Sequence, residues 1–462
     1  MKKALFIVPH EDDELFIGGG TIVRLVNDPS FEVFVLIATN GDYYPYEGPI
    51  RMRESLNGLK TLGVDSDHVI FLGYGDGWQN GHIYDDRESE RCWISHGGHS
   101  ETYSLPEKME WCFEKNAAHH AYTRQNYLYD IKDVLNSLEP DAVFCVDLDA
   151  HHDHQCLSLL TEEAIGMILK EKRHYHPLVL KKFAYENVMV GKHDYFTGTG
   201  ETVNLQGDRT QNPFFSWGER ISVPVPENCY TAVIEQNILY KSARCYKTQK
   251  ICHMAPGYLN SDMVYWQRRT DNLLAHAEIT ASSGDPSYLN DFKLFDSTDL
   301  LKGQFHLDDG CWFPDRLDQE PAITIRLEEP CSAEQLIIYL KHSAGLKNIE
   351  ISIDNMKTQI LKPSAQEWDK VALQLPREEI QNILVSFEIN DGSCFGVSEI
   401  ELLSEDPNQS ILNELTEGSK PVWENGVLSR LDAMVFAAKR KAAVHTKNRY
   451  EKKRQVFDKE GH

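Results

Sequence analysis

The chain has 462 residues, of which 41% are hydrophobic and 26% charged, so it is long enough for about three domains and a large buried core. Its net charge of -24 repels phosphate backbones, which argues against nucleic-acid binding and favours a neutral or cationic substrate. The ten cysteines form no C-x-x-C pair, so we expect reduced thiols and a cytoplasmic protein. No apolar run reaches the roughly 18 residues of a membrane span.

The first 14 residues, MKKALFIVPHEDDE, begin with two lysines and a short apolar run, as a secretory signal peptide does. The run covers only residues 4–8, which is shorter than the roughly 7–15 residues of an exported hydrophobic region. It continues into Pro-His and acidic residues instead of a cleavage site. We therefore expect a first β-strand here and no export signal.

Apolar and periodic segments alternate through the first part of the chain. Strand-like runs lie at 4–8, 33–39, 69–72 and 142–146, and apolar residues recur at helical spacing over 15–26, 50–62 and 125–138. This alternation predicts an α/β fold, a Rossmann-like parallel sheet with helices on both faces. Ligands of such sheets collect beyond the carboxyl ends of the strands, so reactive side chains should follow the strands directly.

The pattern changes from about residue 292. Short alternating runs at 322–328, 348–354, 371–375 and 383–389 predict a smaller antiparallel β-sandwich. The stretch DPNQS then reads as a linker, and residues 431–457 form a helix-prone, strongly basic run. We therefore expect a first domain over 1–290, a sandwich over 295–405, and a linker with a basic C-terminal helix over 406–462.

Two clusters of chemically active residues follow predicted strands. The first is His10-Glu11-Asp12-Asp13-Glu14, and the second is 151–154, His-His-Asp-His. Zinc is bound by imidazole nitrogen and carboxylate oxygen, and a hydrolytic site needs three such ligands and one open position. His10, Asp13 and His154 would supply that set. A divalent cation would also remove the repulsion among acidic side chains crowded into one turn.

The neighbouring residues suggest a hydrolytic mechanism. Asp12 must point away from Asp13, so it would act as general base on a water activated by the metal. The leaving amine would receive its proton from Asp12 or from His151, whose imidazolium would also stabilise an oxyanion. Asp153 would orient a neighbouring histidine.

Several motifs together resemble a known family. They are PHEDDELFIGGGTI, TNGD at 39–42, R-x-x-E with LG over 51–63, FLGYGDG, and PDAVF followed by HHDH. This order resembles the LmbE-like or PIG-L family of zinc-dependent N-acetylglucosamine de-N-acetylases. The resemblance covers residues 1–190, with weaker echoes to about 280.

The resemblance implies roles for individual residues. It implies that His10, Asp13 and His154 ligate the metal, that Asp12 is the base, and that His151 assists the intermediate or the leaving group. It also implies that Arg51 contacts substrate. Glu11 replaces the usual proline of the family, and residue 152 is histidine where proline is common. Neither position is a ligand in the family, so the implied metal set is unchanged.

Two further assignments concern substrate binding. Arg51 and Glu54 lie three residues apart on a predicted helix, so an ordinary surface pair is the alternative to substrate contact by Arg51. Glu54 is assigned a structural role. Asp42 follows the second strand and would accept a hydrogen bond from a sugar hydroxyl, where Gly41 permits the turn.

Other notable residues have simpler explanations. The glycines 18–20 do not follow the strand directly and stand behind four acidic side chains, so they predict close helix packing and not a dinucleotide site. Histidines 96, 99, 119, 120, 174 and 176 are expected in loops or on the surface. Cys145 is expected to be buried. There is no G-x-S-x-G motif for serine hydrolysis.

The later parts are less specific. The sandwich region loosely resembles discoidin-like or galactose-binding-like domains, in which Trp312, Phe313 or Trp368 would stack on sugar rings, or would simply be core aromatics. The basic helix is expected to pack on the body through Leu431, Met434, Val435 and Ala438. Contact with an anionic membrane or docking of an acidic partner are the alternatives.

The sequence thus predicts a cytoplasmic, zinc-dependent hydrolase with one metal ion per chain. It would remove acetyl from an N-acetylated amino sugar of a glycan, glycolipid or glycoside. Ferrous iron tolerates the same ligands. The alternatives are metal-assisted hydrolysis of another amide, an ester or a phosphoester, and a carbohydrate-binding protein with a relict catalytic domain.

Overall fold

The computed structural model describes most of the chain, and the architecture below refers to that part. The described residues are 1–77, 83–84, 86, 90–186, 188–192, 198–230, 234–296, 310–354, 356–390, 393–420, 423–424, 434–435, 437–442 and 444–445.

A seven-stranded sheet forms the centre of the first part, in the order β3-β2-β1-β4-β5-β10-β9. Its first five strands are parallel, whereas β10 and β9 run antiparallel at one edge. The bounds are β1 Lys2–Val8, β2 Phe31–Thr39, β3 Val69–Tyr74, β4 Ala142–Val146, β5 Leu178–Lys182, β9 Ile221–Pro224 and β10 Asp262–Arg268. The predicted parallel sheet is confirmed, and the antiparallel edge is an addition to it.

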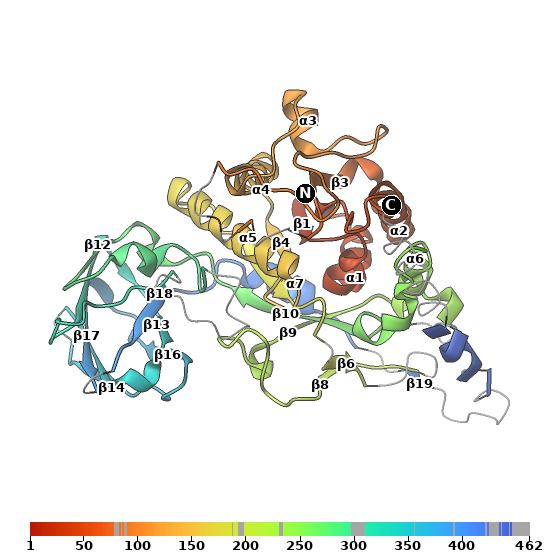
Figure 1. Ribbon diagram of the computed structural model, residues 1–462. Coiled ribbons are helices and arrows are strands. Elements are labelled where there is room, and N and C mark those ends of the chain that lie inside the picture. The colour runs from red at the N-terminus through yellow and green to blue at the C-terminus, as the bar shows by residue number, and fades with distance from the viewer. Residues whose placement is uncertain are drawn as a thin grey trace.

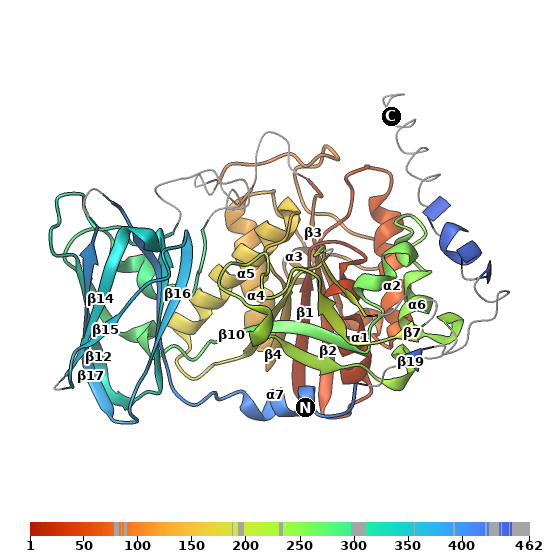
Figure 2. The same ribbon diagram turned by 90° about the horizontal axis from the view of Figure 1, so that it is seen from below.

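Helices cover both faces of this sheet. Figure 2 shows α1, α2 and α6 on one side of the strands and α4 and α5 on the other. Their bounds are α1 Asp13–Val26, α2 Gly48–Leu62, α3 Trp111–Asn116, α4 Arg124–Leu138, α5 His152–Glu171 and α6 Ile238–Ala243. The strands between these layers are almost continuously apolar, as expected for a sheet that is buried on both faces. Each βα connection therefore opens at the same edge of the sheet.

The three glycines of α1 let this helix approach its neighbours closely. A Cβ atom on Gly18 would lie 2.4 Å from the ring of Phe6 on β1, and one on Gly20 would lie 2.3 Å from Val225. No side chain fits at these distances without displacing a neighbour. The prediction that the glycines serve helix packing agrees with these contacts. Cys145, also expected to be buried, is 1% exposed.

The second part is an antiparallel sandwich with its own hydrophobic core. A five-stranded sheet has the order β11-β12-β17-β14-β15, and a three-stranded sheet has the order β16-β13-β18 (Figure 1). The bounds are β11 Glu278–Ala281, β12 Ala322–Ser332, β13 Gln335–Lys341, β14 Leu346–Ile353, β15 Gln359–Leu361, β16 Trp368–Gln374, β17 Glu379–Ile389 and β18 Gly396–Leu403. The predicted sandwich is confirmed.

The sandwich starts earlier along the chain than expected. β11 pairs with β12, although its residues fall in the range predicted for the first domain. Leu274 and Leu289 also belong to the sandwich core, beside the fully buried Trp312. We therefore propose that the second unit begins near residue 273. A strand of four residues leaves too weak a pattern in the sequence to mark this boundary.

The aromatic side chains of the sandwich are packing residues. Trp312 is 0% exposed and lies in the core. Trp368 is half-buried, and its ring centroid lies 4.9 Å from that of Phe295 and 5.5 Å from that of Phe214, at the junction with the first part. Phe313 is also partly buried. The alternative of core aromatics therefore describes Trp312 and Trp368 better than sugar stacking does.

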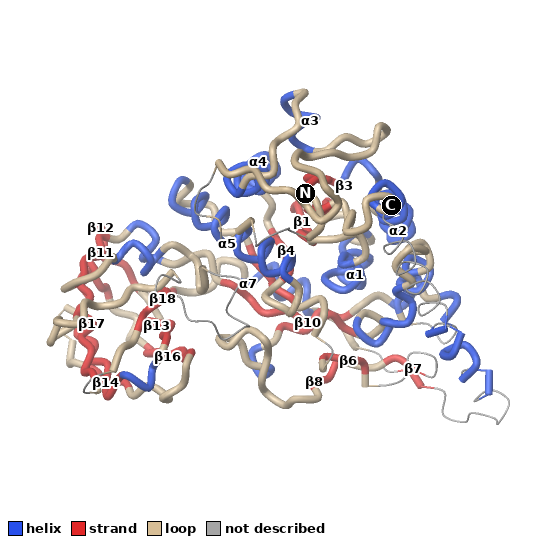
Figure 3. Tube along the Cα trace, viewed as in Figure 1, coloured by secondary structure: helices blue, strands red, loops and turns tan. Residues whose placement is uncertain are grey.

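The chain returns to the first part after the sandwich. Helix α7, Gln409–Thr416, buries Leu412 and Leu415 in the core of the first part, and β19, Trp423–Glu424, pairs with β7, Gly198–Thr199. The predicted linker is thus short and is followed by a packed helix. Figure 3 shows further helical segments at the C-terminal end, residues 434–435, 437–442 and 444–445. No helix among the described residues is long and apolar enough to cross a membrane.

The expected packing of this C-terminal helix is not observed. Met434 is 70% exposed, Val435 is 44% exposed, and Ala438 is exposed. Leu431 lies outside the described residues. An ion pair between Lys439 and Glu235 connects the helix to the body. Met434, Val435 and Ala438 therefore do not pack on the body of the protein. The prediction that they do so is wrong for these three residues.

Candidate metal centre

The first acidic cluster lies in the turn between β1 and α1. Leu5, Phe6 and Ile7 of β1 are fully buried, and the turn that follows the strand at the carboxyl edge of the sheet contains His10. Asp13 and Glu14 occupy the first turn of α1, where carboxylates complement the positive end of the helix dipole. All of these acidic side chains are buried. The turn therefore holds an unusual density of negative charge away from water.

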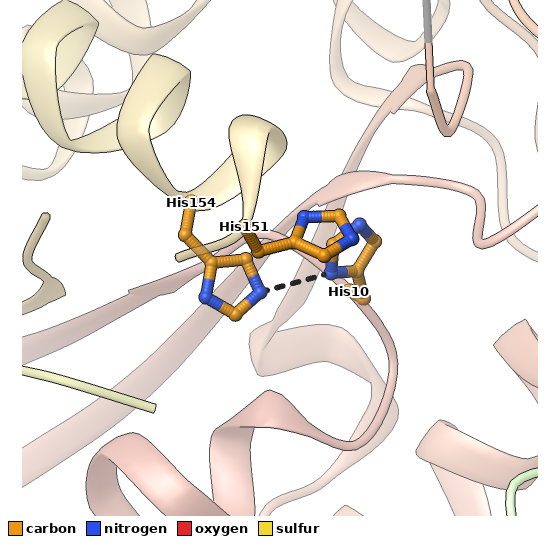
Figure 4. A group of neighbouring side chains, drawn as sticks. All are labelled: His10, His151 and His154. Carbon is orange, nitrogen blue, oxygen red and sulfur yellow. Dashed lines mark hydrogen bonds between the residues drawn. The ribbon is translucent and has the colours of Figure 1, made fainter. Parts of the chain in front are cut away.

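The second cluster lies at the start of α5, beyond β4. His151 is the N-cap of α5, and its Nδ1 accepts a hydrogen bond from the backbone N–H of Asp153 at 3.3 Å. His154 follows in the first turn and is 0% exposed. Because β1 and β4 are paired parallel neighbours, their carboxyl ends bring the two clusters together. Figure 4 shows the rings of His10, His151 and His154 side by side.

Three predicted ligands form a compact triangle. His10 Nδ1 lies 3.0 Å from Asp13 Oδ2, Asp13 Oδ2 lies 3.1 Å from His154 Nε2, and His154 Nε2 lies 3.3 Å from His10 Nδ1. Tetrahedral zinc with ligand bonds of about 2.0–2.2 Å separates its ligand atoms by roughly 3.3 Å. The three atoms therefore stand at the mutual distances that one zinc ion requires.

The buried polar atoms around the triangle also fit a bound divalent cation. Four buried carboxylate oxygens have no hydrogen-bond partner. They are Asp12 Oδ1, Asp13 Oδ1 and both carboxylate oxygens of Glu11. Leaving such groups unpaired is costly. The donor set of two imidazoles and one carboxylate suits zinc or ferrous iron. The residues present therefore fit a divalent metal ion.

Further carboxylates orient the two imidazoles. Asp149 Oδ2 lies 2.7 Å from His154 Nδ1, which leaves Nε2 of this ring for the metal. Asp153 Oδ2 lies 3.3 Å from His10 Nε2, in the orienting role that the sequence predicts for Asp153. Asp76 Oδ1 lies 3.4 Å from the same nitrogen of His10. Carboxylates in this position fix the ring orientation and strengthen the ligand.

Asp12 occupies a strained position beside the triangle. Its backbone has φ 127°, a region that residues with a side chain rarely adopt. Burial, and then the negative charge of Asp13, raise the pKa of Asp12 to about 8. The carboxyl group of Asp12 is thus buried beside the predicted ligand Asp13, and its role as general base stays a prediction.

The charges of the triangle and of the carboxylates around it shift one another's pKa values. Burial opposes charge on His154, but Asp149 and then Asp13 raise its pKa to about 9. For His10, burial is likewise outweighed by Asp76, Asp13 and Asp153, and its pKa is raised. Burial acts to raise the pKa of Asp13, but His154 and His10 lower it well below its usual range. Metal binding would displace the protons on the two imidazoles.

His151 differs from the two other histidines. Its side chain is 40% exposed, and its ring centroid lies 4.7 Å from that of His10. Partial burial and the charge of His10 lower its pKa to about 4. Because Nδ1 accepts from the backbone of Asp153, the ring proton of neutral His151 lies on Nε2. The imidazolium expected from the sequence is thus replaced by a neutral N–H donor on the open side of the triangle.

Arg51 is buried in this site, where it contacts several acidic residues, and it is not part of a surface ion pair. Its guanidinium lies 3.6 Å from Glu11, 3.7 Å from Asp76 and 3.9 Å from Asp12, and it donates to the backbone oxygens of Glu11 and Gly41. The nearby Glu54 is also buried and accepts hydrogen bonds from Thr248, which agrees with a structural role. Contact of Arg51 with substrate stays a prediction.

Asp42 is placed differently from its predicted role. Its side chain is 0% exposed, Oδ1 accepts from the backbone N–H of Asp76, and Oδ2 accepts from the hydroxyl of Tyr103. Both oxygens therefore accept hydrogen bonds inside the protein, and the fully buried side chain is closed to a sugar hydroxyl in this geometry. Asp42 instead ties the turn after β2 to the turn after β3.

Two residues of the site were not predicted from the sequence. Asp76 lies in FLGYGDG directly after β3, and Asp149 lies between β4 and HHDH. The signal for both was their position just after a strand of the parallel sheet, which is where ligands were expected. Their contacts with His10 and His154 could not be predicted, because they arise where the turns after β1, β3 and β4 come together.

Solved structures with some likeness to the chain fall into two groups. N,N'-diacetylchitobiose deacetylase from Pyrococcus horikoshii is 20% identical, with a TM-score of 0.27, over 41% of this chain and 62% of its own. A fucose-binding module from Streptococcus pneumoniae is 18% identical, with a TM-score of 0.22, over 29% of this chain and 95% of its own. The lectin domain of lectinolysin is 9% identical, with a TM-score of 0.23, over 29% and 96%. These TM-scores are too low to support a conclusion about ligand or activity.

Two further comparisons concern sequence alone. No curated protein matches the chain. Residues 5–165 match the family described as PIG-L: GlcNAc-PI de-N-acetylase. The matched range begins in β1 and ends within α5, so it includes the whole of the candidate metal centre.

Proposed function

Residues 5–165 form a PIG-L (LmbE-like) de-N-acetylase domain, and on this premise we propose that the chain is a zinc-dependent hydrolase of N-acetylated amino sugars of the N-acetylglucosamine type. It would release acetate and a free amine in the synthesis of a glycan, glycolipid or glycoside. The observation that carries the proposal is the triangle of His10, Asp13 and His154, with edges of 3.0, 3.1 and 3.3 Å. Ferrous iron is the alternative metal.

The residues around the triangle have complementary roles in this proposal. A divalent ion bound there would supply a Lewis acid and lower the pKa of water. Asp12 takes the proton of the attacking water and returns it to the leaving amine, because it lies next to the ligand Asp13 in the turn that precedes α1. His151 donates the Nε2 proton as a hydrogen bond to the oxygen that becomes negatively charged. Arg51 holds Asp12 in place through its charge.

The proposal is tested by measuring acetate release from a panel of N-acetylated sugars. Asp12→Asn should bind the same amount of metal as the wild type and lose roughly 100-fold or more of the turnover, because the general base is removed. Asp65→Asn, at an exposed carboxylate before η1 (Ser66–His68), is the control and should keep full activity. Full activity of Asp12→Asn would contradict the assigned base. Glycan binding with no acetate release from any sugar would favour the carbohydrate-binding alternative.

Metal content separates the proposal from phosphoester hydrolysis. Phosphoesters are commonly cleaved by two metal ions about 3.5–4 Å apart. The triangle offers ligands for one ion, and His154→Ala should remove that ion together with acetate release. Phosphate release that survives this substitution would point to another site and reaction.

We also propose a reducing cytoplasmic location for the protein. All ten cysteines are free, and five of them are buried, which is common for proteins that keep their thiols reduced. Fractionation of cells that express the tagged full chain would test this. Recovery in the medium alone would contradict it.

A basic surface supports peripheral contact with an anionic membrane. A depression of about 680 Å³ between α2 and α6 is lined by four cations that have no ion-pair partner among the described residues, namely Lys60, Lys241, Arg244 and Lys247. The basic C-terminal helix lies beside α6 (Figure 1), where Lys439 pairs with Glu235. In a chain of net charge -24, such a concentration of positive charge favours phosphate-bearing lipid headgroups.

Vesicle sedimentation tests this contact. The chain should sediment with vesicles of anionic phospholipid and not with neutral ones, and Lys241→Glu with Arg244→Glu should abolish the difference. Arg53→Glu, an exposed cation on α2 that pairs with Glu107, is the control and should leave sedimentation unchanged. Equal sedimentation with both kinds of vesicle would contradict the proposal.

A further inference from the structure

The connection between β3 and α4, residues 75–123, is unusually long for its content of regular structure. In the described part of it, α3 is the one helix, and isolated bridges such as Glu101 with Ala121 supply most of the order. Connections longer than about 12–15 residues without regular structure are uncommon and need something to hold them. Most of this connection is nevertheless well packed, with Tyr122 and Thr102 fully buried.

Metal-ligating side chains converge inside this segment. Cys112 Sγ on α3, a ring nitrogen of His120 and a carboxylate oxygen of Asp130 on α4 lie within 4.8 Å of one another. Cys112 and Asp130 are each 1% exposed. Glu110, beside α3, is 0% exposed, and its charge acts on both His120 and Cys112. None of these residues belongs to the triangle of His10, Asp13 and His154.

Neighbouring side chains hold these groups close together. Tyr74 donates its hydroxyl to Asp130 Oδ2 at 2.8 Å, and His120 Nδ1 lies 2.9 Å from Asp130 Oδ1 and 3.1 Å from Asp130 Oδ2. Glu110 Oε1 is bound by His119 and Thr102, while Glu110 Oε2 is buried with no hydrogen-bond partner. A buried oxygen without a partner is costly, and a cation bound beside it would offset that cost.

We propose that Cys112, His120 and Asp130 form a second metal site, which binds a zinc-type ion independently of the candidate metal centre. The donor set of one thiolate, one imidazole and one carboxylate is acceptable to zinc. The buried carboxylate of Glu110 adds negative charge beside this set. Cys112 gives up its thiol proton to solvent when the sulfur–metal bond forms.

The consequence is a fixed conformation for the long connection. The ion would join α3 and residue 120 to α4, and so hold the intervening residues against the sheet. Tyr103, next to Thr102, donates to Asp42, which in turn accepts from the backbone of Asp76 beside His10. The second ion would thereby support the wall of the candidate catalytic centre without touching its ligands. Burial raises the pKa of the Cys112 thiol.

Cobalt substitution of the full chain distinguishes the two sites. Thiolate bound to Co²⁺ gives a sulfur-to-metal charge-transfer absorption in the near ultraviolet, and the triangle contains no sulfur ligand. The wild-type chain should bind about two equivalents of Co²⁺ and show this absorption. Cys112→Ser should lose the absorption and one equivalent of metal. Cys145→Ser, at another buried cysteine, should keep both.

Further variants separate this site from the proposed function and from misfolding. His154→Ala should lose the other equivalent and keep the charge-transfer absorption, so the two metal assignments fail independently. If Cys112→Ser does not fold, Asp130→Asn, which keeps the shape of the side chain, should bind Co²⁺ at this site at least 10-fold more weakly. A wild-type chain that binds Co²⁺ without the absorption, or an absorption that survives Cys112→Ser, would overturn the second site.

Discussion

Asp149 and Asp153 contact different imidazoles of the candidate metal centre. Asp149 bonds Nδ1 of His154 at 2.7 Å and also accepts from the backbone N–H groups of Ala184 and Tyr185, so its position is firmly set. Asp153 contacts His10 at the longer distance of 3.3 Å. The orientation of the His154 ring is therefore fixed more firmly, by Asp149, than that of His10 by Asp153. The sequence analysis had assigned an orienting role to Asp153 alone.

Asp149→Asn is expected to weaken metal binding by about 10- to 100-fold, because the amide cannot enforce the tautomer that exposes Nε2 of His154. Titration of the metal-free chain with Zn²⁺ in competition with a chelator measures this. Asp65→Asn is the matched control and should bind Zn²⁺ as the wild type does. An unchanged affinity of Asp149→Asn would show that His154 is oriented by its packing alone.

The backbone of Asp12 makes a prediction about stability. Its φ of 127° costs free energy in the folded state. Asp12→Gly removes this cost and should raise the free energy of unfolding by about 1–3 kcal/mol while abolishing turnover. Asp12→Asn keeps the backbone strain and should be less stable than Asp12→Gly in urea denaturation. The reverse order would show that the strain is absent in solution.

Strand β5 contains two buried lysines whose effects on stability differ because their neighbours differ. Lys181 and Lys182 are adjacent and both buried. Lys181 lies 2.9 Å from Asp147 and pairs with Glu162, so its charge is compensated. Burial lowers the pKa of Lys182 to about 8, and the distant charge of Asp262 compensates it only weakly. The two lysines should therefore respond oppositely to substitution.

Lys182→Met should stabilise the chain by up to about 3 kcal/mol at pH 7, whereas Lys181→Met should destabilise it by about 3–5 kcal/mol because two carboxylates lose their partner. The pKa of Lys182 lies below its ordinary value of 10.5, so the unfolded chain binds the proton more tightly between pH 8 and 10.5. Wild-type stability should thus rise with pH across this window, and the advantage of Lys182→Met should disappear. Denaturation at pH 7 and pH 10.5 measures both effects, and a constant difference would contradict the assigned cause.

At the level of the full chain, the two units are joined by buried polar contacts. Arg268 on β10 pairs with Glu401 on β18, and both side chains are 2% exposed. Asn272 donates to the backbone oxygen of Ile400 and accepts from the backbone N–H of Leu402. Arg173 and Glu328 form a second ion pair between the units, but this pair is more than half exposed.

Removal of these two cations should have unequal effects. Arg268→Met leaves Glu401 buried without its partner and should lower the free energy of unfolding by about 3–5 kcal/mol. Arg173→Met removes a solvated pair and should change it by less than about 1 kcal/mol. Chemical denaturation of both variants, followed by tryptophan fluorescence, makes the comparison. Equal effects would mean that the junction is not the buried contact described above.

The amino-acid sequence was sufficient for the elements and for the main chemical clusters. The four predicted strands and three predicted helices of the first part match β1 to β4, α1, α2 and α4, because apolar periodicity directly reflects burial. The triangle of His10, Asp13 and His154 followed from two motifs placed after strands. Local pattern carries this information, since each motif lies within a few residues of the strand that positions it.

Pairings between distant segments depended on the folded chain. The contacts of Asp76 and Asp149 with the imidazoles, the early start of the sandwich at β11 and the return of α7 to the first core all join residues far apart in sequence. Asp42, assigned to substrate from its position, proved to be enclosed by Tyr103 and the backbone of Asp76. Burial and partner choice are set by the packing of several elements at once, and hydrophobic periodicity along the chain contains no record of which elements meet.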